Sequence, residues 1–153
     1  DAGVVAREGA SVSGRRLVVA LAALLAACAT AQPAGREAAF PAGTTFAWLG
    51  TDAGGARRNA PADPTRYTIV FEPSGRTTLR LDCNRGSARW ERDGAALALS
   101  PIAGTKMMCP RGSLDVAYAA DLAQVASWRA EGETLILSGR DGSTMRFRPM
   151  APK

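Results

Sequence analysis

The sequence predicts a mostly β domain of the α+β class, a small twisted antiparallel sheet that closes toward a barrel with one helix packed across it. Three observations lead to this expectation. Apolar and polar residues alternate over most of the chain after residue 45, as they do in strands with one buried face. Turn pairs such as Asp93-Gly94 and Asp141-Gly142 separate the alternating segments. One segment instead repeats its apolar residues at helical spacing.

The first predicted strand begins with Phe46 and Trp48, and a loop rich in glycine, alanine and proline follows over residues 50–64. Residues 66–71 form the second predicted strand, which the turn triplet Pro73-Ser74-Gly75 ends. The third strand has two distinct faces. One face carries Thr77, Leu79, Leu81 and Cys83, and the other carries Thr78, Arg80 and Asp82.

Two later hairpins share one pattern, W-x-x-[DE]-G-x-x-L-x-L-S, which starts at Trp90 and again at Trp128, 38 residues further on. The similarity indicates either a duplicated hairpin or only the likeness of any two hairpins with one buried face. We expect the tryptophans to fill the core. A last strand over residues 143–148 follows, in which Met145 and Phe147 alternate with polar residues.

The helical segment begins near Ser113, a residue that can cap a helix, with Asp115 in the favourable first turn. Its apolar stripe is Leu114, Tyr118, Leu122 and Val125. We interpret the preceding pair, Met107 and Met108, as core or a strand edge rather than a functional methionine site.

The N-terminal residues have the features of an export signal. Arg15 and Arg16 precede 11 apolar residues, Leu17 to Ala27, a stretch too short to span a bilayer. Leu25-Ala26-Ala27-Cys28 resembles the bacterial lipobox, the site of lipid attachment and cleavage. The alternative is an alanine- and leucine-rich helix buried in a cytosolic domain.

The order of these features favours a lipoprotein. We therefore expect upstream residues and a signal peptide over 1–28, a lipid on Cys28, a flexible tether over 29–44, a folded domain over 45–149 and a tail over 150–153. This predicts a protein of the bacterial cell envelope, held to the membrane through Cys28. Ala29, rather than Asp, after the cysteine favours the outer membrane, facing the periplasm.

Three cysteines are present, and lipid on Cys28 leaves Cys83 and Cys109 free to pair in an oxidising compartment. A bridge between them closes 26 residues and contributes roughly 3–4 kcal/mol in the loop-entropy description. Free structural thiols and a reactive thiol are the alternatives. Two cysteines without histidine or a C-x-x-C spacing make a poor zinc site.

Composition narrows the possible chemistry. The chain has no histidine, which excludes Ser-His-Asp and Cys-His catalysis and imidazole metal sites. Its 19 basic and 14 acidic residues give a net charge of +5, but the basic residues are scattered, and we predict no nucleic-acid partner. The carboxylate pairs lie at predicted turns. We predict no enzymatic activity, cofactor or metal.

The succession Cys83-Asn84-Arg85-Gly86, Trp90, Gly94, Leu97, Leu99 and Thr105 to Pro110 resembles the META domain, or HslJ-like heat-shock, family. The likeness covers Phe46 to Phe147. Asp82 stands where the family usually has glycine, and Trp48 and Leu49 are adjacent where the family separates them by one residue. The resemblance implies a compact β-rich envelope domain, often a lipoprotein, associated with stress or secretion and without an established enzymatic activity.

Two functional hypotheses follow. The first is a non-enzymatic, lipid-anchored module that binds an unidentified envelope protein in a stress-related role. The second is an inhibitor of a secreted hydrolase, similar in plan to lysozyme- or protease-inhibitor lipoproteins. Asn84 and Arg85 are the candidate interaction residues, because an arginine beside a disulfide can present a fixed guanidinium to an anionic partner. The alternative is that Asn84 and Gly86 serve turn geometry and Arg85 is solvated.

Overall fold

The computed structural model describes residues 39–151, which contain ten strands and one α-helix. The strands are β1 (Thr45–Ala53), β2 (Ala56–Asn59), β3 (Tyr67–Phe71), β4 (Arg76–Leu81), β5 (Asn84–Asp93), β6 (Ala96–Leu99), β7 (Ala103–Gly104), β8 (Val125–Glu131), β9 (Thr134–Gly139) and β10 (Thr144–Pro149). The helix is α1 (Asp115–Ala123), and Pro64–Arg66 form one turn of 3-10 helix.

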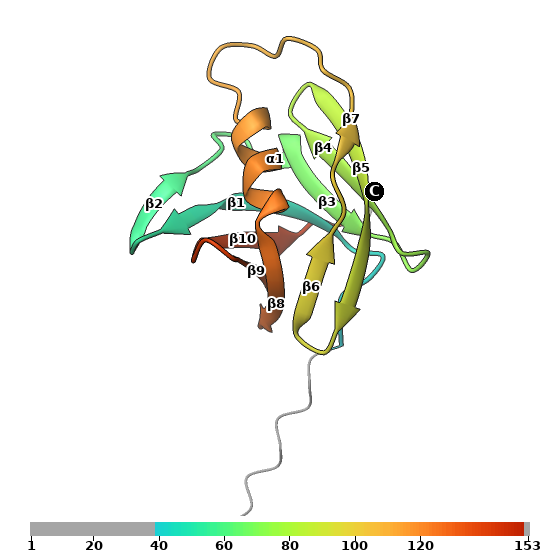
Figure 1. The fold of residues 1–153 in the computed structure, drawn as a ribbon. Helices are drawn as coiled ribbons and strands as arrows, with labels where there is room; N and C mark the ends of the chain where they lie inside the picture. The colour runs from blue at the N-terminus through green and yellow to red at the C-terminus, as the bar shows by residue number, and fades with distance from the viewer. Residues whose placement is uncertain (1–38, 152–153) are drawn as a thin grey trace, which may run out of the picture. The chain divides into compact units, whose positions relative to one another are not determined.

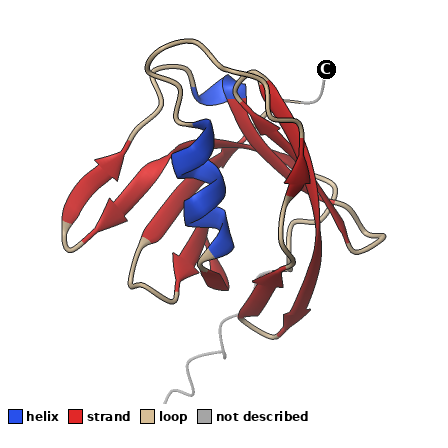
Figure 2. Cartoon of the chain, turned by 45° about the horizontal axis from the view of Figure 1, so that its top comes forward, coloured by secondary structure: helices blue, strands red, loops and turns tan. Residues whose placement is uncertain are grey.

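Eight of these strands close into an antiparallel barrel, in the order β10-β9-β8-β6-β5-β4-β3-β1 with β1 paired back to β10. The two remaining strands extend it: β2 pairs with β1, and β7 pairs with β5. Figures 1 and 2 show the curved sheet and α1 lying across its opening. The predicted mostly β class, with one helix packed on a sheet that closes into a barrel, is therefore confirmed.

The barrel interior follows the alternation in the sequence. In β4, Thr77, Leu79 and Leu81 are buried and the intervening residues are exposed. The same alternation buries Met145 and Phe147 in β10. Closure lets each strand bury one face without leaving an unpaired edge within the barrel.

Tyr118 of α1 fills the interior under the helix. Its ring stacks on Trp48 with 4.7 Å between centroids and meets Tyr67 edge-on at 5.8 Å. Tyr118 and Leu122 are both fully buried, so two residues of the predicted stripe join the helix to the barrel core.

A second aromatic cluster forms around Phe40. Its ring lies 4.8–5.1 Å from those of Phe71, Trp90 and Trp128. The sequence predicts Phe40 to lie in the tether, but it packs against the core, so the packed domain begins before Thr45. The sequence pattern missed it because a single aromatic residue among alanines, prolines and glycines has no periodicity.

The two hairpins that share a sequence pattern also share a register. Trp90 pairs with Leu99, and Trp128 pairs with Leu137, 38 residues further on in both strands. The two hairpins meet where β6 pairs with β8 through Ala96 and Ser127. The indole nitrogen of Trp128 donates to the carbonyl oxygen of Gly94 across this junction at 2.9 Å.

Three local predictions need correction. Within the predicted loop over 50–64, β1 continues to Ala53 and turns through two glycines into β2, an exposed strand without apolar alternation. The helix begins at Asp115 with Leu114, not Ser113, at its N-cap position. Val125 belongs to β8, because the helix ends at Ala123.

Among residues 39–151, no helix is long and apolar enough to cross a bilayer. The predicted signal peptide, Cys28 and most of the tether lie outside the described residues.

Candidate functional site

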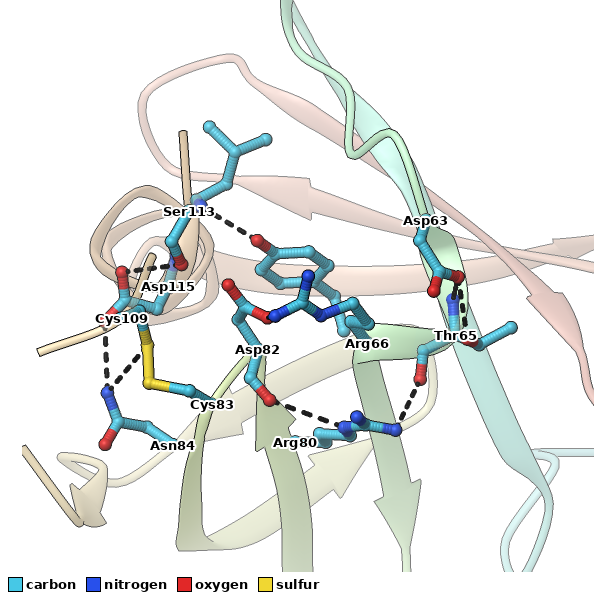
Figure 3. A network of polar contacts seen from close by, with 12 residues as sticks. Asp63, Thr65, Arg66, Arg80, Asp82, Cys83, Asn84, Cys109, Ser113 and Asp115 are labelled. Atoms are coloured by element: carbon cyan, nitrogen blue, oxygen red, sulfur yellow. Dashed lines mark hydrogen bonds and ion pairs between the residues drawn. A yellow bond between two sulfur atoms is a disulfide. The ribbon is translucent and has the colours of Figure 1, made fainter. Parts of the chain in front are cut away.

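The most exposed apolar residues of the domain lie near one loop, which we call the methionine loop and define as residues 105–112, between β7 and α1. The predicted disulfide is present: Cys109 in this loop is joined to Cys83 in the β4–β5 turn, with 5.5 Å between their Cα atoms. The disulfide ties the loop to a hairpin of the barrel (Figure 3).

Asn84 holds the same loop from beneath. Its side-chain oxygen accepts hydrogen bonds from the Met107 backbone N–H at 2.8 Å and from the Thr105 hydroxyl at 2.9 Å. Its amide nitrogen donates to the Met107 carbonyl oxygen at 3.1 Å and to the Asp115 carboxylate at 3.2 Å. Because Asn84 is 3% exposed, these partners satisfy a buried amide that water does not reach.

The methionine side chains point away from this anchored backbone. Met107 is 59% exposed and Met108 is 99% exposed, and Val116 on the adjacent helix is 77% exposed. Our expectation that the methionines form core or a strand edge is therefore wrong. The backbone N–H and carbonyl of Met107 both bond to Asn84 beneath the loop, and the methionine side chains lie on the outside.

A hollow of about 390 Å³ lies beside the loop. Its lining includes Met107 and Val116 together with Ile102, Leu81 and Lys106. The surface is thus largely apolar, with Lys106 and Asp115 as its charged residues. Such an exposed apolar surface on a small domain is a feature of interaction sites.

An ion pair between a buried carboxylate and a partly exposed guanidinium supports the turn that carries Cys83. Asp82 is 5% exposed, and its carboxylate pairs with the guanidinium of Arg66. Asp82 also adopts a positive φ of 61°, which explains why glycine is usual here in the family that the sequence resembles. The alternation predicts Asp82 to share the outer face with Arg80, but Asp82 lies in the turn and is buried.

Neighbouring contacts tie this turn to the start of the helix. The Tyr67 hydroxyl accepts a hydrogen bond from the Leu114 N–H at 2.8 Å, and the Asp115 N–H donates to the Ser113 hydroxyl at 3.3 Å. Asp63 caps the 3-10 turn before β3, and hydrogen bonds from the hydroxyl and N–H of Thr65 lower the pKa of that carboxyl below its usual value of 3.8.

A second polar cluster joins β2 to α1 and to the β9–β10 turn. Arg58 donates to the buried carboxylate of Asp121 at 2.5 Å and to Asp141 at 3.2 Å. Asn59 adds a hydrogen bond to Asp121 at 3.1 Å. Hydrogen bonds from Ser143, reinforced by Arg58, lower the pKa of Asp141. These residues fasten the β1–β2 hairpin to the barrel.

The structure treats the two predicted interaction residues differently. Asn84 is buried and fully engaged with the methionine loop, and the turn before it is made by Asp82 and Cys83 rather than by Asn84. Arg85 is exposed, and its backbone pairs with Thr105. The sequence reasoning missed Asp82, Arg66 and Asp121. The glycine-to-Asp departure at position 82 was the one available signal.

Together these features define a class: a small closed β-barrel domain that carries a disulfide-anchored loop. A family model described as the META domain matches residues 43–152, and the chain belongs to that family.

Three solved structures share the fold. One is an NMR structure of a protein from Burkholderia xenovorans, with 22% identity, a TM-score of 0.61, and coverage of 72% of this chain and 84% of that one. A DUF4847 family protein from Bacteroides vulgatus has 16% identity, a TM-score of 0.51, and coverage of 73% and 96%. A further NMR structure has 20% identity, a TM-score of 0.50, and coverage of 69% and 87%. No curated protein matches the chain.

Proposed function

We propose that this META domain protein is a non-enzymatic, lipid-anchored module of the bacterial cell envelope that binds another envelope protein through the methionine loop, in a stress-related role. The observation that carries the proposal is the exposure of Met107 and Met108 on a backbone held by Asn84 and a disulfide. A loop ordered before binding loses less conformational entropy when it binds, and methionine adapts to irregular apolar partners.

The polar residues of the site support binding rather than catalysis. Asn84 bonds to the backbone of the methionine loop, and Asp82 pairs with Arg66. A general acid or base needs a polar group turned toward a substrate, whereas these groups hold chain segments in place. The exposed surface they support is largely apolar.

The anchoring part of the proposal rests on the lipobox-like residues that end at Cys28. We propose that lipid on Cys28 holds the domain at the outer membrane, facing the periplasm. The test is cell fractionation of the Cys28→Ser variant. We expect the variant to leave the membrane fraction, and an unchanged distribution contradicts lipid anchoring.

The binding part is tested by photo-crosslinking in cells before and after heat stress. A photoreactive residue replaces Met108, and the matched control replaces Glu133, an exposed residue in the β8–β9 turn. We expect one stoichiometric partner at position 108 that position 133 does not capture. Equal capture at both positions, or a diffuse set of unfolded proteins at 108, contradicts a discrete binding site.

A second candidate is an inhibitor of a secreted hydrolase. The specific observation in its favour is that the nearly fully exposed Met108 stands beside the disulfide-bonded Cys109, so its side chain projects from an anchored loop. Inhibitors that insert a loop into an active site use such prior ordering. The test adds purified protein to lysozymes and proteases. Tight inhibition that Met108→Asp abolishes supports this function, and the absence of inhibition rejects it for the hydrolases used.

A further inference from the structure

The outer face of the β4–β5 hairpin carries two pairs of arginines. In the register of the hairpin, Arg76 lies opposite Arg89 and Arg80 lies opposite Arg85. All four are exposed. Side chains directly opposite on neighbouring antiparallel strands have Cβ atoms about 5 Å apart, and like charges in such positions repel. The hairpin therefore places together four cations that would be more stable apart.

The four arginines of this face form no ion pair with the described acidic residues. The ion pairs among residues 39–151 involve Arg57, Arg58, Arg66, Arg129 and Arg146, and none of the four arginines of the hairpin. Arg80 donates only to backbone oxygens, those of Thr65 and Asp82. Three acids lie near the face. Glu72 accepts a hydrogen bond from the Thr78 hydroxyl at 2.5 Å, Glu91 is exposed on β5 two residues after Arg89, and Asp63 interacts electrostatically with Arg80.

The residues between the arginine pairs leave the face open. Thr78 lies opposite Ser87, so two small hydroxyl side chains separate the pairs. Beyond β5, Ser87 pairs with Ala103 and Gly86 with Gly104. The two arginine pairs are four residues apart, about 13 Å along a strand. Such a face offers guanidinium forks and the Ser87 hydroxyl to several phosphates spread over a flat surface.

The position of the chain entry favours a membrane as the source of these phosphates. The ring of Phe40 lies 4.8 Å from that of Trp90, which packs against the core, so the chain enters the domain at the end of the barrel where Arg89 lies on the outer side of β5. Ten residues, 29–38, separate Cys28 from the described domain, and a chain of that length spans at most about 35 Å. A lipid on Cys28 would keep the arginine face within reach of headgroups.

We propose that the arginine face, defined as Arg76, Arg80, Arg85 and Arg89, docks on the anionic phosphate headgroups of the membrane. This deepens the proposed function, because it gives an anchored domain a fixed side toward the bilayer. Docking relieves the repulsion within each arginine pair.

The test measures binding of the full chain to vesicles of phosphatidylcholine with and without about one-third phosphatidylglycerol. Arg85→Gln/Arg89→Gln removes one arginine from each pair. The matched control, Arg140→Gln/Arg148→Gln, removes the same charge elsewhere. The wild type and both variants carry the same apolar N-terminal stretch. A difference between them in the preference for anionic over neutral vesicles therefore reports on the arginine face.

We expect the wild-type protein to prefer anionic vesicles, and the Arg85/Arg89 variant to lose that preference by about 30-fold, since each arginine near an anionic surface contributes about fivefold. The control variant keeps most of it. Equal losses in the two variants, or no anionic preference in the wild type, overturn the proposal. Tighter binding of a single-stranded oligonucleotide than of vesicles also overturns it, in favour of nucleic acid.

Two further readouts keep this test separate from folding and from lipid anchoring. The Arg85/Arg89 variant is expected to melt no lower than the wild type, because it removes like-charge contacts; a lower melting temperature contradicts the repulsion on which the proposal rests. The vesicle preference is independent of the Cys28→Ser fractionation. Lipid anchoring and the arginine face can therefore fail separately.

Discussion

Asn84 organises the methionine loop through one buried amide. Its oxygen and nitrogen satisfy both the N–H and the carbonyl of Met107, which gives the loop the backbone pairing that a strand would otherwise supply. The chemical reason for asparagine is that it offers a donor and an acceptor on one short side chain. An aspartate here would lose the donor and would face the Asp115 carboxylate.

We expect Asn84→Ala to lower the free energy of unfolding by about 2–4 kcal/mol, because it leaves several buried groups of the loop without partners. Urea denaturation measures this loss, and amide exchange at Met107 should quicken at the same time. Arg85→Ala is the control. Its side chain is exposed, so a change within about 0.5 kcal/mol is expected. Wild-type stability in Asn84→Ala contradicts this role.

Tyr118 differs from Tyr67 in what its hydroxyl contacts. The Tyr118 hydroxyl is buried and has no hydrogen-bond partner among residues 39–151, whereas the Tyr67 hydroxyl accepts from Leu114. We expect Tyr118→Phe to be at least as stable as the wild type at neutral pH. Tyr67→Phe should lose about 1 kcal/mol. The two thermal melts, measured side by side, test this difference.

The same burial predicts an alkaline effect. Burial raises the pKa of Tyr118 well above its usual value of 10. The folded protein therefore keeps the proton while the unfolded chain ionises, so this contribution to stability is complete below pH 10 and falls as the pH rises above it. At pH 11 the ionisation of this tyrosine in the unfolded chain sets an upper limit of about 1.4 kcal/mol on the loss. Tyr118→Phe should lack this part of the decline; identical alkaline profiles contradict the prediction.

At the scale of elements, the two related hairpins use the same turn. Gly94 and Gly132 have φ values of 55° and 59°, and both occupy the first position of a two-residue connection between strands. A Cβ atom at either position would meet nothing within 4 Å. Substitution is therefore resisted by backbone conformation and not by steric contact.

We expect Gly94→Ala and Gly132→Ala each to cost about 1–2 kcal/mol, the penalty of a left-handed conformation for a residue with a Cβ atom. Equilibrium unfolding of both variants measures the two losses. Equal losses of unfolding free energy in the two variants would show that the two turns have the same energetics. A difference of more than about 1 kcal/mol would show that the shared pattern does not produce shared energetics.

For the whole molecule, the disulfide joins the methionine loop to the barrel. It closes 26 residues of chain that include β5, β6 and β7. We expect Cys83→Ser/Cys109→Ser to lose roughly 3–4 kcal/mol and to melt at a markedly lower temperature. Cys28→Ser, which leaves the bridge intact, is the control. An unchanged melt in the double variant contradicts the stabilising role of the bridge.

The strands of the barrel could be predicted from the sequence, but the pairing that closes the barrel could not. The strands of β4 and β10 were predictable because a buried face repeats every two residues along one segment. The pairing of β1 with β10 was not, because it joins segments about 100 residues apart and no local pattern records it. The strand β2 was missed for a different reason: its exposed residues lack alternation.

The candidate site, too, could be predicted only in part from the sequence. From the sequence came the two cysteines, the positions of Asn84 and Arg85, and the helix that follows the loop. The inward direction of Asn84, the outward direction of Met107 and Met108, and the pairing of Arg66 with Asp82 were decided by contacts between residues distant in the chain.

The sequence by itself therefore determined the class of the domain, its turns and its family, because periodicity, glycine conformation and motif succession are local properties. Tertiary structure alone decided which side of each loop faces the core and which charges stand together. Arg80 and Arg85 are ordinary solvated residues when read along the chain. They become one cationic pair only in the register of the β4–β5 hairpin, because strand pairing sets the distance between them.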